Sequence, residues 1–348
     1  MPRTIKVATI QMDANLAPVN ERLARAEKIV TEATQSGAQL IILPELFNIG
    51  YAYSDDNFKL AEPMDGMTSS WMKATAIRLN IHLAGTLLIS EQGEIYNSLL
   101  LFSPSGQQWR YDKNYPWAWE RGYFRERRGV TVANTELGDL GMLICWDVGH
   151  ANLWKQYAGQ IDMMVIASCP PDGPNATYEF PDGNHLRFSE LGTAMEAITD
   201  TGNLVFDDMV NQQAVWLGVP VANSGATGSI RTRIPKAKSL LASLLLFAPG
   251  LRKQWKNANQ MQMAADMIWS CKIVDANGQV VAKRTPGEGE GYVMGEVHLA
   301  DQKPISKEPQ PKSPLPPLAY LQADVVVPWL MRSIYRNGKK LINYTGKT

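Results

Sequence analysis

The sequence Ile-Leu-Pro-Glu-Leu-Phe, residues 42–47, ends an apolar run and places one carboxylate, that of Glu45, at the start of a loop. Two later stretches have the same form. Tyr-Asp-Lys ends a strand-like run at Lys113, and Leu-Ile-Cys-Trp-Asp places Cys145 at the end of an apolar run. A carboxylate, an ammonium and a thiol at strand ends are the base, the oxyanion stabiliser and the nucleophile of an acyl-transfer site. We therefore expect a hydrolase of carbon–nitrogen bonds.

Hydrophobic periodicity predicts strands that alternate with helices. Strands are expected over 5–11, 38–43, 81–89, 96–102, 109–112, 142–144, 163–167, 215–222, 270–275, 280–283 and 292–297, and helices over 19–35, 68–79, 153–158 and 190–199. The segment 169–183 is rich in Pro, Gly, Asp and Asn and is expected to form a long loop. This order predicts an α/β or α+β layered domain with its reactive residues at strand ends.

Composition excludes several classes of protein. The 34 Lys and Arg residues balance 34 Asp and Glu residues, so whole-chain attraction to nucleic acid is not indicated. The three cysteines show no CxxC spacing and the four histidines no i,i+4 pairing, so neither a disulfide framework nor a metal site is expected, and no cofactor is expected. No apolar run reaches about eighteen residues and the first residues lead straight into a strand, so the expected location is the cytoplasm.

As a set, these motifs resemble the nitrilase superfamily of carbon–nitrogen hydrolases, whose Glu-Lys-Cys triad occurs in this order. The matching stretches are Pro44-Glu45-Leu46-Phe47, Tyr111-Asp112-Lys113, Glu120-Arg121-Gly122-Tyr123-Phe124 and Ile144-Cys145-Trp146-Asp147. Weaker landmarks match at Asn211-Gln212, at Asn223 and at the hairpin 273–278. The resemblance covers roughly residues 5–230 and 268–298.

The resemblance implies a four-layer αββα sandwich that pairs into a homodimer or a higher homo-oligomer. Asp147, directly after Cys-Trp, resembles the amidase branches, since nitrilases more often place Glu there. The chain also departs from the family pattern, with Val148-Gly149-His150 followed by Ala151-Asn152 where many amidases have Pro-Glu. The substrate branch therefore stays open.

The expected roles follow from thiol chemistry. Cys145 attacks as a thiolate, so Glu45 must take its proton, and Lys113 with the backbone N–H of Trp146 would stabilise the oxyanion. Collapse of the adduct gives a thioester, which water activated by Glu45 would hydrolyse. Glu120 is a second carboxylate that would hold Lys113 or the amine end of the substrate.

The substrate pocket is expected near the tryptophans that lie between Lys113 and Glu120. Trp117, Trp119 and Tyr51 are the candidate substrate-binding residues, and they would suit a bulky apolar substrate as well as ordinary core packing. Cys169 and Cys271 are expected to be core residues.

Residues 231–267 depart from the family pattern as an insert, in which a Leu-rich run is flanked by cations. This composition suits a helix that dips into one leaflet of a membrane. The candidate membrane-contacting residues are Leu240, Leu241, Leu244, Leu245, Phe247 and Trp255. The alternative is that the run packs in the core or in a subunit interface.

Residues 301–348 repeat this composition as a Pro-rich arm followed by a basic helix, which leaves residues 1–300 as the hydrolase domain. The apolar segment 325–331 precedes Arg332, Arg336, Lys339, Lys340 and Lys347, a pattern that suits an anionic membrane surface. The alternative is that this helix docks on a partner subunit.

Together these features predict an amidase that acts on a linear, small-molecule or lipid-like amide, peripheral on the inner face of a membrane. A nitrilase or an N-acyltransferase would share the triad and the thioester. A non-catalytic membrane-associated scaffold is the alternative from another class.

Overall fold

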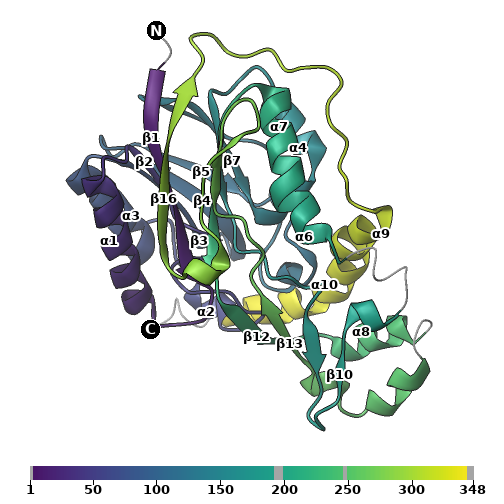
Figure 1. Ribbon diagram of the computed structural model, residues 1–348. Helices are drawn as coiled ribbons and strands as arrows, with labels where there is room; N and C mark the ends of the chain where they lie inside the picture. The colour runs from purple at the N-terminus through teal and green to yellow at the C-terminus, as the bar shows by residue number, and fades with distance from the viewer. Residues whose placement is uncertain (1–2, 192–198, 246–248, 343–348) are drawn as a thin grey trace.

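The computed structural model describes residues 3–191, 199–245 and 249–342. Its centre is β1 (Arg3–Asp13), which pairs in parallel with β2 (Leu40–Ile42), antiparallel with β16 (Gly291–Leu299), and at its last residues in parallel with β11 (Val221–Thr227). Within the described residues, twelve strands form one continuous sheet of two halves, joined where β1 meets β11. Strands β1 and β16 lie side by side in Figure 1.

The strand order along the sheet is β5-β4-β3-β2-β1-β11-β8-β7-β6. The first half contains β3 (His82–Glu91), β4 (Glu94–Phe102) and β5 (Gln108–Asp112). The second half contains β6 (Val132–Thr135), β7 (Gly138–Ile144), β8 (Met163–Ala167), β14 (Lys272–Val274) and β15 (Val280–Lys283).

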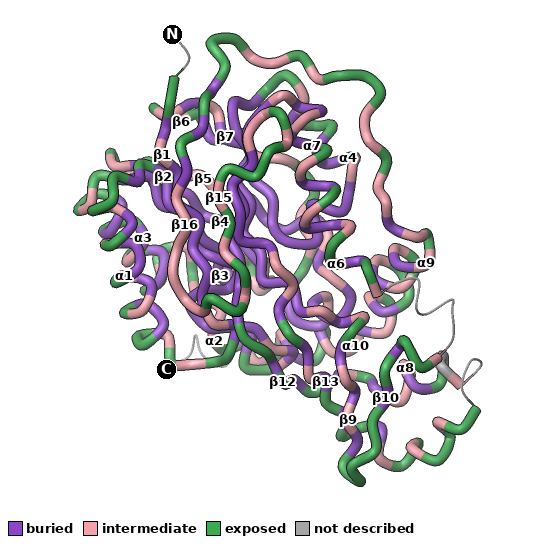
Figure 2. The backbone as a smooth tube through the Cα atoms, viewed as in Figure 1, coloured by how far each residue is buried: buried purple, intermediate pink, exposed green. Residues whose placement is uncertain are grey.

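The two halves face each other, because β4 and β5 contact β7 and share one apolar core with it. On the outer face of the first half lie α1 (Val19–Gln35) and α3 (Met67–Leu79), over a second apolar cluster. On the outer face of the second half lie α4 (Ala151–Gln156) and α7 (Val210–Leu217) (Figure 1). The strands are the most buried part of the molecule (Figure 2). The four-layer αββα fold is confirmed.

Local sequence explains most of the element boundaries. Helix α1 has the predicted bounds because its apolar residues repeat at helical spacing, and Gly37, at φ +95°, ends it. The predicted strand 215–222 is wrong in its first half, because residues 215–217 end α7 and β11 begins only at Val221. Gly218, at φ +69°, ends α7. The prediction was wrong because the apolar residues on both sides of Gly218 repeat at neither the helix nor the strand period.

The insert belongs to a small lobe with its own antiparallel sheet, β10-β9-β13-β12. The segment predicted as a long loop contributes β9 (Thr177–Glu179), followed by β10 (His185–Leu186). The insert adds β12 (Ser229–Arg233), α8 (Ala237–Leu244) and β13 (Gln262–Asp266), and α8 and β10 lie to one side of the large sheet (Figure 1). Most of the predicted helix 190–199 lies outside the described residues.

The C-terminal arm runs back over the molecule without helix or strand from residue 300 to residue 316 (Figure 1). It ends in α9 (Pro317–Tyr320), a π-helical turn (Leu321–Val326) and α10 (Val327–Gly338), which packs on the turn Ala118–Gly122.

Gly338 at the end of α10 lies against Phe58 of the short helix α2 (Asn57–Leu60), and a β-carbon there would come within 2.0 Å of the Phe58 ring. Gly338 therefore lets α10 approach the domain closely. No helix in the described part of the chain is long and apolar enough to cross a membrane.

Candidate active site

Three strand ends bring the predicted triad together. Glu45 follows β2, Lys113 follows β5 and Cys145 follows β7, and all three residues are buried. Lys113 Nζ donates a hydrogen bond of 2.7 Å to Glu45 Oε1. The Cys145 thiol interacts with the same carboxylate. The carboxyl ends of the parallel strands β2 and β7 lie at one edge of the sheet, which is why residues far apart in sequence meet here.

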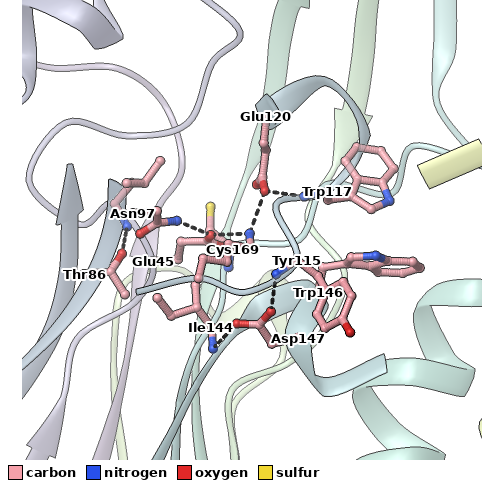
Figure 3. A network of polar contacts seen from close by, with 12 residues as sticks. Glu45, Thr86, Asn97, Tyr115, Trp117, Glu120, Ile144, Trp146, Asp147 and Cys169 are labelled. Carbon is pink, nitrogen blue, oxygen red and sulfur yellow. Dashed lines mark hydrogen bonds and ion pairs between the residues drawn. The ribbon is translucent and has the colours of Figure 1, made fainter. Parts of the chain in front are cut away.

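Both oxygens of Glu45 also accept hydrogen bonds from groups outside the triad, and Asn97 and Cys169 are labelled near Glu45 in Figure 3. Asn97 Nδ2 donates to Oε1 at 2.7 Å, and the backbone N–H of Cys169 donates to Oε2 at 3.1 Å. Burial raises the pKa of Glu45 to about 7, although Lys113 opposes the rise. A carboxylate with this pKa can accept and release a proton near neutral pH.

Lys113 is held between two carboxylates. Its Nζ also donates to Glu120 Oε2 at 2.7 Å. Burial alone would lower the pKa of Lys113, but Glu120 and Glu45 raise it well above its usual value, so the side chain is a permanent cation.

Glu120 is oriented by further bonds, because Tyr51 Oη donates to its Oε1 at 2.7 Å and the Trp117 N–H to its Oε2 at 2.6 Å. Of the two roles considered for Glu120, this geometry favours holding Lys113.

Cys145 occupies a strained backbone position, with φ at +47°, at the start of a 3₁₀ turn (Cys145–Gly149). Asp147 secures this turn, since it accepts the Tyr115 N–H at 2.7 Å and the Tyr111 hydroxyl at 2.8 Å. Burial and the nearby Glu45 raise the pKa of the Cys145 thiol well above its usual value, although Lys113 opposes the rise. The thiol is therefore neutral at rest and depends on a base.

A small cavity of about 40 Å³ lies over the thiol. Cys145, Glu120, Tyr51, Trp117 and Trp146 are among the residues that line it. Of the triad, Cys145 lines this cavity, and Glu45 and Lys113 lie behind it. The hydrogen bonds that Asp147 accepts from Tyr111 and Tyr115 indicate that this residue positions the turn.

A larger, mostly apolar cavity of about 390 Å³, which we call the vestibule, adjoins this small cavity. The two share Trp117, Trp146, Pro174 and Thr201. The vestibule is walled by Trp119, by the insert helix α8 through Leu240, and by the helices of the C-terminal arm. The structure thus places Tyr51 at the thiol, Trp119 in the vestibule and Trp117 between the two.

The C-terminal arm also bonds the residues that follow the nucleophile. Asp324 accepts the Trp146 Nε1–H at 3.0 Å and lies 2.9 Å from His150 Nε2. The His150 ring stacks on Tyr115 at a centroid distance of 3.6 Å. Gly149 also accepts a hydrogen bond from the Tyr320 hydroxyl, so Trp146, Gly149 and His150 form the docking site of the arm.

Two site residues were not predicted from the sequence. Asn97 lies in the middle of the buried strand β4, and a polar residue in such a strand is a signal for a bonding role. The backbone N–H of Cys169 leaves no signal in the sequence, and the side chains of Cys169 and Cys271 are buried as expected. Within the described ranges, no group of three His, Cys, Asp or Glu side chains is arranged to hold a metal ion.

The residues expected to contact a membrane differ in how deeply they are buried in the structure. Leu241 is 0% exposed and packs inside the protein, so its prediction as a membrane contact is wrong. An apolar helix face suits a protein core as well as a lipid surface, which is why the sequence did not separate them. Leu240 and Leu245 are half-buried, and Trp255 is exposed, with Lys238 Nζ 5.9 Å from its ring centroid. Phe247 and the Leu244 side chain lie outside the described part.

Comparison with known proteins agrees with this geometry. Residues 6–306 match the family model described as carbon-nitrogen hydrolase, and the chain belongs to this family. It is 28% identical over 147 residues to a nitrilase of Pyrococcus abyssi, covering 41% of this chain and 56% of that protein. It is also 28% identical over 168 residues to omega-amidase NIT2-A of Xenopus laevis, covering 43% and 59%. The chain thus spans little more than half the length of these curated relatives.

Solved structures share the fold at lower identity. Nit3 of Saccharomyces cerevisiae, a member of the nitrilase superfamily, has a TM-score of 0.59 at 20% identity, covering 86% of this chain and 91% of that chain. An amidase from Nesterenkonia sp. AN1 with a covalent addition at its active site cysteine has a TM-score of 0.59 at 15% identity, covering 84% and 90%. These likenesses establish the nitrilase superfamily fold.

Proposed function

We propose that this protein hydrolyses a linear amide through a thioester on Cys145. One observation carries the proposal. A thiol that lines a small cavity lies beside a buried carboxylate with a pKa of about 7, which is bonded to a buried permanent cation. These are the nucleophile, the base and the electrophilic group that acyl transfer requires.

The first half of the reaction would form the acyl-enzyme. Glu45 takes the proton of Cys145 while the sulfur attacks the amide carbon, and Lys113 with the Trp146 N–H stabilises the oxyanion. The first N–H groups of a helical turn have no carbonyl partner within that turn, so they can donate to another group. The Trp146 N–H lies at this position and is therefore suited to bind the oxyanion. The carbon–nitrogen bond then breaks, and the leaving nitrogen takes the proton from Glu45 and departs as ammonia or an amine.

The second half would release the acid. Water occupies the place of the amine, Glu45 removes a proton from it, and the hydroxyl adds to the thioester carbon. The second oxyanion uses the same two donors. The carbon–sulfur bond breaks, the thiolate takes the proton back from Glu45, and the carboxylic acid leaves.

The cavities support a substrate with a bulky apolar portion or an acyl chain. The space of about 40 Å³ over the thiol accommodates only the reacting group. The vestibule beyond it, about 390 Å³ with mostly apolar walls, suits the rest of the molecule.

Two enzymatic alternatives share the thioester, and one alternative is not enzymatic. A nitrilase would start from a nitrile, and an N-acyltransferase would pass the acyl group to an amine instead of water. Asp147 does not separate amidase from nitrilase here, because its carboxylate accepts hydrogen bonds within the protein. The hydrogen bonds within the intact triad disfavour a non-catalytic scaffold.

The proposal includes a place of action, the cytoplasmic face of an anionic membrane, and assembly as a homodimer or higher homo-oligomer. Exposed apolar side chains of the C-terminal helices beside the vestibule support the membrane location. Vesicle flotation tests the location, and light scattering after size exclusion tests the assembly.

Release of ammonia from a series of primary amides with acyl chains of increasing length tests the function. We expect release that depends on Cys145 and a kcat/KM that rises with chain length, because each added methylene finds apolar walls. Nitriles of matched chain length and an amine acceptor separate the enzymatic alternatives. Equal rates for the native protein and Cys145→Ala would refute the proposal, and they would favour the scaffold if both rates equal the rate without protein.

A further inference from the structure

The C-terminal helices expose an apolar ridge. Leu321, Val325 and Trp329 follow one another at intervals of four residues, which places them on one helical face. Their exposed fractions are 50%, 57% and 63%. Apolar side chains gathered in this way mark a surface that contacts another apolar phase.

A groove lined largely by cations adjoins this ridge. It has a volume of about 860 Å³ and lies between α10 and the loop that follows the turn Ala118–Gly122. Its cationic lining residues are Arg121, Arg125, Arg128, Arg332, Arg336 and Lys339, against two carboxylates, Glu126 and Asp324.

Both carboxylates that line the groove have partners, and Glu94 pairs with two more of the lining cations, Arg125 and Lys339. Glu126 pairs with Arg121, and Asp324 bonds Trp146 and His150. In the part of the chain that the structure describes, Arg128, Arg332 and Arg336 form no ion pair. The groove therefore presents uncompensated positive charge.

The ridge and the groove meet at the vestibule. Val326 and Trp329 line both the groove and the vestibule, and Leu321 lines the vestibule from the ridge. A surface that bound both the ridge and the groove would therefore lie against the wall of the vestibule.

We propose that the groove binds the phosphate group of an anionic lipid while the ridge enters the leaflet, so that the vestibule opens toward the bilayer. This inference rests on the proposed membrane location and names the part of the protein that would carry it. The leucine run of the insert has a different role, since Leu241 is buried and Leu240 lines the vestibule.

Charge favours a membrane over a second copy of the chain. A two-fold contact places the same surface on both partners. Such a contact would bring Arg332 and Arg336 of both copies into one interface, which concentrates like charge there. An anionic lipid surface is instead complementary to them, and the exposed Trp329 suits the interface between headgroups and acyl chains.

The experiment measures partition of the full chain onto vesicles of phosphatidylcholine with and without about one third phosphatidylglycerol. The variant Arg332→Glu/Arg336→Glu is compared with Lys28→Glu/Lys73→Glu. The control has the same change in net charge and lies on α1 and α3, and neither of its residues lines the groove or the vestibule. Each cation at an anionic surface changes partition about fivefold, so the groove variant should lose at least about 25-fold and the control little. Trp329→Ser should weaken binding without changing its dependence on anionic lipid.

Four results would overturn the proposal. Equal losses in both charge variants would show a net-charge effect, and unchanged binding in the groove variant would exclude the groove. If glycerol phosphate binds the native protein saturably but not the groove variant, and the native protein does not bind vesicles, the groove binds a soluble phosphate instead of a lipid. A native dimer that dissociates in the groove variant would count against the membrane.

Thermal unfolding of each variant shows that it is folded, so lost binding is not lost structure. Amide hydrolysis by the native protein in detergent-free solution is measured separately. Hydrolysis without vesicle binding would refute lipid binding by the groove and leave the proposed amide hydrolysis unaffected. Vesicle binding that depends on the groove, without hydrolysis of any amide, would support lipid binding by the groove and refute the proposed amide hydrolysis.

Discussion

The hydrogen bond from Asn97 to Glu45 sets the pH at which the proposed base works, and Asn97→Leu removes it. Leucine has nearly the same size and carries no donor. The Asn97 Oδ1, which is lost along with the amide, has no hydrogen-bond partner among the described residues. The remaining change is the loss of the 2.7 Å bond to Glu45 Oε1. The effect should therefore appear mainly in the protonation of Glu45.

A hydrogen bond to a charged group contributes about 1.5 to 3 kcal/mol. One pKa unit corresponds to about 1.36 kcal/mol, so the pKa of Glu45 should rise by about one to two units from its value of about 7. Glu45 must be ionised to take the proton of Cys145. The acid limb of kcat/KM against pH should therefore move upward, with a loss of about five- to fifty-fold at pH 7.

The assay is kcat/KM against pH for an amide that does not titrate in the range. Asn134→Ala is the matched control, because it also removes an amide-to-carboxylate hydrogen bond, to Asp139 at 2.6 Å, but on the surface. We expect the native profile for this control. An acid limb that stays in place in Asn97→Leu would refute the assignment of Glu45 as the base.

Three further changes test other parts of the structure. Lys113→Met leaves two buried carboxylates without their shared cation, which should lower the free energy of unfolding by about 3 to 5 kcal/mol and abolish acylation, as read from thermal melts and burst kinetics. Gly338→Ala should lower stability by about 1 to 3 kcal/mol in chemical denaturation, because the new β-carbon overlaps the Phe58 ring, whereas Gly287→Ala, with no neighbour within 4 Å, should not. Leu240→Glu places a charge in the vestibule wall and should raise KM for long-chain amides more than for acetamide, and an equal rise for both would contradict the assignment of the vestibule.

The fold followed from the sequence where one physical signal dominated. Helix α1 was predicted with its bounds because its apolar residues have a clean helical period and a glycine follows it. The triad was predicted because residues at the ends of parallel strands meet at one edge of a sheet. A local pattern was sufficient for the helix, whereas the triad needed three separate motifs and their resemblance to the nitrilase superfamily.

The remaining features depend on contacts between distant segments. Asp324 meets Trp146 and His150 across more than 170 positions of sequence, so no local pattern predicts that the C-terminal arm would complete the wall of the vestibule. The burial of Leu241 was missed for a related reason. A short apolar helix face has the same appearance whether it meets lipid or protein, and only the packing of the lobe decides.

The acyl-enzyme tests the proposed chemistry most directly. Glu45→Gln keeps the shape of the base but cannot accept a proton, so hydrolysis of the thioester should be slowed and the acyl group trapped. Intact mass of this variant after incubation with a long-chain amide should increase by the mass of the acyl group, and the increase should be absent when Cys145→Ser is added. No increase in mass, or an increase that persists with Cys145→Ser, would contradict the account.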